Sequence, residues 1–159
     1  MCDTGTLLLP SGSTVSDIQW EYQNTAAGGA TPTALSLDAA RSYLNSLGLP
    51  AAPSPKFSGQ KNGVVLLITD GLPNCNGSLN RTTCTCTPST LGCSGTSGTP
   101  YNCLDDSRTI ASAQALKSAG YLVYVVGFGT GSSGNNKAVL DAIASAGGTT
   151  NSYSASSQT

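Results

Sequence analysis

Runs of apolar residues alternate along the chain with stretches of amphipathic spacing. The run Val64–Thr69 is apolar on both faces and rich in β-branched residues, and 121–128 is a second run of this kind. Near-continuous apolar runs are typical of parallel strands that helices cover on both faces. A short last strand is expected over 151–155, and residues 6–9, closed by Pro10, are a further strand candidate.

The first predicted helix follows a glycine-rich stretch. Thr31 can serve as its N-cap, and Pro32 suits the first helical position because the N–H that proline lacks would have no partner there. Apolar residues then recur at helical spacing until Gly48 ends the helix.

Two further helices are expected over 107–119 and 137–146, each followed by glycine. Residues 11–30 are polar and rich in turn-forming types, so no element is expected there. The alternation of strands and helices predicts an α/β fold with a mainly parallel sheet and right-handed crossovers.

The composition is unusually low in charge. Only 9% of the 159 residues are charged, against about 25% in a typical globular domain, and the net charge is −1. This balance excludes nucleic-acid binding by bulk charge and disorder caused by charge repulsion. Because no apolar run approaches a length of about 18 residues, we expect no membrane insertion.

The 6 cysteines and the absence of histidine favour a secreted or cell-envelope protein. Met1 is not followed by the basic and apolar stretches of a signal peptide, so we expect the chain to be a piece of a longer protein.

Five cysteines lie in a long loop, 72–104, that has no core of its own, and this favours disulfides. A zinc site would use Cys-x-x-Cys pairs or histidine, and the chain has neither. The sequence does not choose the pairing, although the odd number in the loop suggests that Cys2 joins it. The predicted disulfide residues are Cys2, Cys75, Cys84, Cys86, Cys93 and Cys103.

Three stretches stand in register: 28–35 (Gly-Gly-Ala-Thr-Pro-Thr-Ala-Leu), 65–71 (Val-Leu-Leu-Ile-Thr-Asp-Gly) and 122–129 (Leu-Val-Tyr-Val-Val-Gly-Phe-Gly). Together they resemble the von Willebrand factor type A domain, in particular secreted bacterial members with a Cys-rich loop. The resemblance implies a Rossmann-like three-layer sandwich with a mainly parallel central sheet. We therefore expect one such domain over 1–159, with the loop 72–104 as a disulfide-rich insertion.

The resemblance also implies a site for one divalent cation. The family's metal motif combines Asp-x-Ser-x-Ser after the first strand, a Thr in a Gly-rich loop and an Asp that ends a later strand. The Thr falls on Thr31 and the Asp on Asp70. Their oxygens are hard ligands that suit Mg²⁺, with Mn²⁺ or Ca²⁺ as alternatives. The implied partner is a protein or peptide that offers an acidic side chain to the ion.

This chain departs from the family pattern at both ends. Nothing upstream of Thr31 matches Asp-x-Ser-x-Ser, and 105–109 (Asp-Asp-Ser-Arg-Thr) spells a similar motif where Asp and Ser are expected to cap a helix instead. The chain also ends before the family's last helix. We expect an incomplete copy that lacks the first strand and helix, leaves one edge of the strand 64–69 unpaired and does not hold Mg²⁺ tightly.

The expected function is therefore a non-enzymatic binding or adhesion module that recognises a protein partner through a cation site, incomplete in this chain. Two alternatives stay open. One is a metal-independent structural or surface-assembly subunit. The other is a metal-dependent hydrolase that uses Asp70. The chain has no histidine and no recognisable nucleophile–base pair, and both observations argue against a hydrolase.

Overall fold

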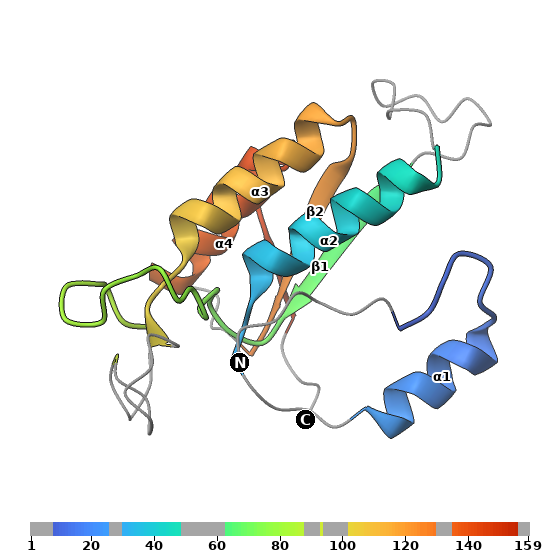
Figure 1. The fold of residues 1–159 in the computed structure, drawn as a ribbon, viewed down its shortest axis with the longest axis horizontal. Helices are drawn as coiled ribbons and strands as arrows, with labels where there is room; N and C mark the ends of the chain where they lie inside the picture. The colour runs from blue at the N-terminus through green and yellow to red at the C-terminus, as the bar shows by residue number, and fades with distance from the viewer. Residues whose placement is uncertain are drawn as a thin grey trace.

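Among the residues that the structure describes, the sheet has three parallel strands in the order β1-β2-β3. The computed structural model describes residues 8–25, 30–48, 63–87, 93, 102–129 and 135–155. The strands are β1 Val64–Thr69, β2 Leu122–Phe128 and β3 Tyr153–Ala155, and the helices are α1 Val15–Asn24, α2 Thr33–Ser46, α3 Asp106–Ser118 and α4 Asn135–Ala146. The predicted α/β sandwich with a parallel sheet is confirmed (Figure 1).

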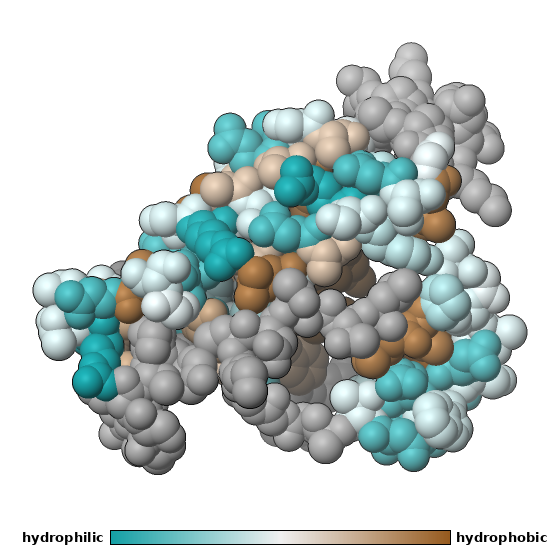
Figure 2. Space-filling view, viewed as in Figure 1, coloured by the Kyte–Doolittle hydropathy of each residue, from teal (hydrophilic) through white to brown (hydrophobic). Residues whose placement is uncertain are grey.

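The hydrophobic core lies between one face of the sheet and the helices α2, α3 and α4. Val123 and Val125 of β2 are fully buried there against Leu37 of α2, Leu116 of α3 and Ile143 of α4. Right-handed crossovers explain this layer, because β1-α3-β2 and β2-α4-β3 advance in the same direction and so place both helices on one face. The outward surface of this layer is largely polar (Figure 2).

The opposite face of the sheet is exposed in the part of the chain that the structure describes. Leu66 and Ile68 of β1 are 59% and 64% exposed, and Phe128 of β2 is 46% exposed. The expectation that helices cover both faces of 64–69 is therefore wrong for these residues, since every described helix that packs on the sheet lies on the other side. The exposed large side chains of this face are Val64, Leu66, Ile68, Tyr124, Phe128 and Tyr153.

The edge of β1 away from β2 has no partner strand among the described residues. The strand candidate over 6–9 does not supply one where it is described, because residues 8 and 9 are not in a strand. Residues 6 and 7 and the first turn of a last helix, at 156–159, lie outside the described residues. None of the described helices is long and apolar enough to cross a membrane.

Helix α1 corrects the expectation that 11–30 holds no element. It begins with a capping box in which the Asp17 N–H donates to Thr14 Oγ1 (3.3 Å) and the Thr14 N–H donates to the Asp17 carboxylate (2.7 Å). The bond from the Thr14 N–H, followed by one that Thr14 Oγ1 donates to the same carboxylate (2.7 Å), holds the pKa of Asp17 below its usual value. None of the residues of α1 is buried, so the cap and local bonds, not packing, define this helix.

The carboxylate of Asp141 fastens β3 to α4. It accepts two hydrogen bonds from Lys137 Nζ (2.6 and 2.8 Å), one from the Ser152 N–H (2.9 Å) and one from Ser152 Oγ (2.6 Å). Ser152 directly precedes β3 and is buried. The bond from Lys137, followed by those from Ser152, lowers the pKa of Asp141 to about 2.

We predict that Asp141→Asn lowers the free energy of unfolding at neutral pH by about 1 kcal/mol. The folded-state pKa lies below the unfolded value of 3.8, so this contribution is present above pH 3.8 and is lost as the pH falls toward about 2. Urea denaturation across this pH range should show the two proteins converging in acid. Asp38→Asn is the control, because its ion pair with Arg41 is longer, at 3.7 Å, and should contribute only about 0.3 kcal/mol.

The contrast between the two faces of the sheet gives a second prediction. Leu116→Ala should cost about 3 kcal/mol of folding free energy, because it leaves a cavity in the core, whereas Leu66→Ala should change it by at most about 0.5 kcal/mol. Chemical denaturation of both variants measures the difference. Equal losses of folding free energy in the two variants would contradict the exposure of the sheet face that carries Leu66.

Candidate functional site

A hollow of about 520 Å³ lies where the carboxyl ends of β1 and β2 meet the beginning of α2. Its walls include Thr31 before α2, Asp70 after β1, and Ile68 and Phe128 near the ends of β1 and β2. In open α/β sheets, ligands bind at this carboxyl edge. The two residues that the sequence suggests as metal ligands, Thr31 and Asp70, thus line the same hollow.

Two hydrogen bonds hold Thr31 beside the loop that follows β1. The Thr31 N–H donates to Asn74 Oδ1 (2.7 Å), and the Asn74 N–H donates to the Thr31 carbonyl (2.9 Å). These long-range bonds explain why Thr31 is not the N-cap of α2, as its sequence position suggests. The helix begins at Thr33 with Pro32 as the N-cap residue, and no side chain caps it.

The Thr31 hydroxyl points toward the turn that contains Asp70. A Cβ placed on Gly71 would lie 3.7 Å from Thr31 Oγ1, so the hydroxyl stands beside the residue that follows Asp70. The turn is fixed by Thr69 Oγ1, which donates to the Gly71 carbonyl (2.8 Å). Asp70 is exposed and Thr31 is half-buried, so both can meet a ligand from solution.

The oxygen ligands at this hollow are of the type that Mg²⁺ binds, but they are too few to complete a Mg²⁺ site. One hydroxyl and one carboxylate are hard oxygen ligands, and Mg²⁺ commonly keeps several waters in its octahedral shell. Protein cation sites nevertheless use more anionic ligands than one when they bind tightly. Thr31 and Asp70 therefore fit a cation partially, and the hollow needs further ligands to hold it firmly.

The sequence 105–109, which imitates the metal motif, has a structural role at the start of α3. Asp105 occupies the N-cap position, yet its side chain makes no cap bond and accepts instead from Asn76 Nδ2 (2.7 Å). The Asp105 N–H donates to the Pro73 carbonyl (2.9 Å). Burial raises the pKa of Asp105, against the opposing effect of the Asn76 bond. The expectation that this carboxylate caps α3 is therefore wrong, and Asp105 anchors the loop after β1 instead.

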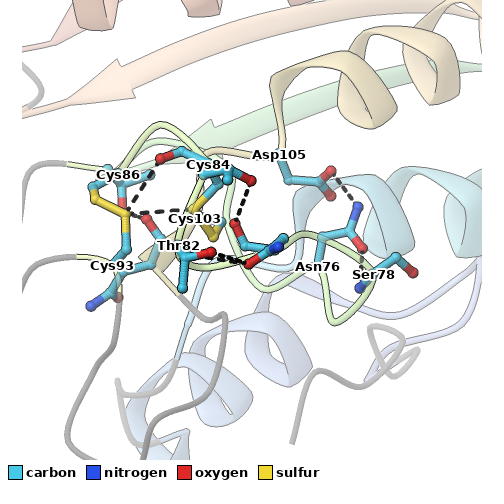
Figure 3. Close-up of a disulfide and its surroundings, with 12 residues drawn as sticks. Asn76, Ser78, Thr82, Cys84, Cys86, Cys93, Cys103 and Asp105 are labelled. Atoms are coloured by element: carbon cyan, nitrogen blue, oxygen red, sulfur yellow. Dashed lines mark hydrogen bonds between the residues drawn. A yellow bond between two sulfur atoms is a disulfide. The ribbon is translucent and has the colours of Figure 1, made fainter.

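The cysteine loop is closed by disulfides (Figure 3). Cys84 bonds to Cys103 and Cys86 bonds to Cys93, and Cys75 is also disulfide-bonded. Cys2 lies outside the described residues. The Sγ atoms of Cys84, Cys93 and Cys103 lie within 4.8 Å of one another, but sulfurs already in disulfides offer no thiolate to a metal. The arrangement therefore favours disulfides over zinc.

Comparison with known proteins found a similar structure but no sequence relative. No family model and no curated protein matches the chain. The structure is similar to that of the pilus adhesin SpaC from Lactobacillus rhamnosus GG in its open conformation, with a TM-score of 0.49 and 19% sequence identity. The match covers 92% of this chain and 19% of that chain, so the chain spans about a fifth of the adhesin. A likeness this distant does not extend to function.

The bonds between Thr31 and Asn74 lead to a third prediction. Asn74→Ala removes the acceptor of the Thr31 N–H, so we expect a loss of about 1 kcal/mol of folding free energy and faster hydrogen exchange at the Thr31 amide. Asn80→Ala is a matched control in the same loop, because Asn80 is exposed and its side-chain oxygen accepts from the nearby Thr82 and not from Thr31. Unchanged exchange at Thr31 in Asn74→Ala would contradict this account of the loop.

Proposed function

We propose that the protein is an adhesion-type binding module that recognises a protein or peptide partner through a divalent-cation site at the hollow of Thr31 and Asp70, a site that is incomplete in this chain. The observation that carries the proposal is the position of Thr31 Oγ1 beside Gly71, within a hollow that Asp70 also lines. Long-range bonds to Asn74 keep this arrangement in place.

Each residue of the site has a simple role in this proposal. Asp70 contributes the negative charge that attracts the ion, and the Thr31 hydroxyl contributes a neutral oxygen. A cation held by few anionic ligands remains a strong electrophile, and in that state it accepts a carboxylate from a partner. Mg²⁺ is the first choice, and Mn²⁺ or Ca²⁺ is an alternative with the same ligand chemistry.

The disulfides support an extracellular or cell-envelope setting. Disulfides persist in oxidising compartments, and here they tie together a loop that begins directly after Asp70 and reaches Thr31 through Asn74. Long loops that a rigid scaffold positions are common recognition surfaces. We therefore place the partner at the carboxyl edge of the sheet, with the disulfide-bonded loop shaping one side of it, and assign the module no catalytic role.

A metal-independent role in surface assembly is the second candidate. The observation that favours it is the apolar face of Leu66, Ile68 and Phe128, beside an edge of β1 that no other described strand pairs with. Exposed faces and strand edges of this kind are surfaces that subunits bury against one another. Association through them would persist in EDTA, whereas binding through the cation would not.

The test uses Mn²⁺, whose paramagnetism broadens the NMR signals of nearby nuclei even when binding is weak. We expect Mn²⁺ to broaden the amides of Thr31, Asp70 and Gly71 first. Asp70→Asn should abolish that selectivity, because it removes the charge that attracts the ion. Glu21→Gln on α1, which is not part of the hollow, should leave the broadening unchanged.

Calorimetry with Mg²⁺ completes the experiment. With only Thr31 and Asp70 as ligands, this chain should show no site of millimolar or better affinity. Broadening that is absent from the hollow, or that survives Asp70→Asn, would remove the cation from the proposal and leave assembly as the better candidate.

A further inference from the structure

Four cysteines form one cluster in which the two disulfides touch (Figure 3). Cys84 Sγ and Cys93 Sγ belong to different disulfides and lie 3.5 Å apart. Disulfides exchange when a thiolate attacks a sulfur of another disulfide. A thiolate released at Cys93 would therefore already contact the sulfur that it must attack.

The backbone pairs the cysteines differently from the sulfurs. Cys86 and Cys103 face each other in an isolated antiparallel bridge. The Thr87 N–H donates to the Asn102 carbonyl and the Leu104 N–H to the Thr85 carbonyl, both at 2.7 Å, so the bridged residues form a non-hydrogen-bonded pair. Such pairs have Cα atoms about 4.5 Å apart, within the range of about 4.4–6.8 Å that a disulfide spans. Cys86 and Cys103, which the backbone places opposite each other, are each disulfide-bonded to a different cysteine.

We propose that this cluster is a thiol–disulfide exchange switch whose second state pairs Cys84 with Cys93 and Cys86 with Cys103. The co-reactant is a low-molecular-weight monothiol in its thiolate form. It enters at Cys86, the most exposed of the four, whereas Cys103 is fully buried. The proposal is independent of the cation site.

The exchange proceeds in three balanced steps. The monothiolate attacks Cys86 Sγ, a mixed disulfide forms there, and the Cys86–Cys93 bond breaks with Cys93 leaving as a thiolate. The Cys93 thiolate attacks Cys84 Sγ, so that the Cys84–Cys93 bond forms and Cys103 leaves as a thiolate. The Cys103 thiolate then attacks Cys86 Sγ, forms the Cys86–Cys103 bond and returns the monothiolate. Two disulfides exist before and after, and nothing is oxidised or reduced overall.

Loop closure does not favour one state over the other. The entropy of a closed loop depends on the logarithm of its length, and the second pairing replaces separations of 19 and 7 by two of similar size. What changes is the anchoring of residue 93, which moves from Cys86 to Cys84, while the backbone bridge at Cys86 and Cys103 becomes covalent. The exchange therefore changes which cysteine of the loop after Asp70 holds residue 93.

The experiment maps the pairing in the oxidised full chain. The protein is incubated with catalytic reduced glutathione at mildly alkaline pH, where part of the thiol is ionised. It is then quenched with acid, digested with pepsin and fragmented by electron transfer. Backbone cleavage between Cys84 and Cys86 shows whether Cys84 is linked to the peptide of Cys93 or to that of Cys103. The same incubation without glutathione is the control.

Before exposure to the thiol we expect Cys84 to be linked only to Cys103. Afterwards the link to Cys93 should account for at least about a tenth of the molecules, as expected for two pairings with similar loop lengths. A pairing that stays with Cys103, whether or not glutathione reaches Cys86, would overturn the proposal, as would a bond between Cys84 and Cys86.

Cys86→Ser isolates the central step, because it leaves Cys93 without its partner and needs no added thiol. The Cys93 thiolate should attack the Cys84–Cys103 bond, so that alkylation of the protein in denaturant, where the buried Cys103 becomes accessible, labels Cys103 as well as Cys93. Labelling at Cys93 alone would overturn the proposed relay.

Discussion

The parallel pairing of β1 with β2 is the constraint on which the core and the site both depend. The register runs from Val64 opposite Leu122 to Thr69 opposite Gly127, and it aligns the carboxyl ends of the two strands at one edge. Because side chains alternate between faces, a slip by one residue would move Val123 and Val125 out of the core. The same slip would separate Asp70 from the end of β2. The core and the hollow therefore both require this register.

Polar side chains with few charges secure the segments around this sheet. Asn74 joins the segment before α2 to the loop after β1, and Asn76 joins that loop to the start of α3 through Asp105. Asp141 joins α4 to the segment before β3. A chain with only 9% charged residues thus positions its loops with amides, hydroxyls and single buried or ion-paired carboxylates. These hydrogen bonds are 2.6–2.9 Å long and join residues that lie at least 11 positions apart in the sequence. Such bonds explain how a loop can hold Thr31 in a defined place.

Local patterns were sufficient to predict β1, β2, α3 and α4, because the spacing of their apolar residues and the glycines that follow them can be read from a short stretch of sequence. Long-range bonds were not predictable in this way. The Asn74 contact moves the start of α2 beyond Thr31, and Asn76 withdraws the Asp105 carboxylate from its cap. The α1 helix could have been found from the Thr14-x-x-Asp17 box, in which Asp replaces the usual Glu.

The expectation that Thr31 and Asp70 lie at one edge came from the family resemblance of three sequence stretches, because the pattern of elements alone does not place the segment before α2. The disulfide pairing could not be predicted, because it depends on which backbone segments meet in the folded loop. The exposure of Leu66 and Ile68 could not be predicted either, since a strand that is apolar on both faces carries no sign of which face its neighbours cover.

That exposed face has a thermodynamic consequence. Its side chains belong to Leu, Ile, Val, Phe and Tyr residues, and their hydration raises the heat capacity of the protein in this state. Any event that covers them, whether association of copies or docking of another segment, removes this hydration. It must therefore carry a negative change in heat capacity, whereas the proposed binding of an ion at Thr31 and Asp70 would bury little apolar surface and leave the heat capacity nearly constant.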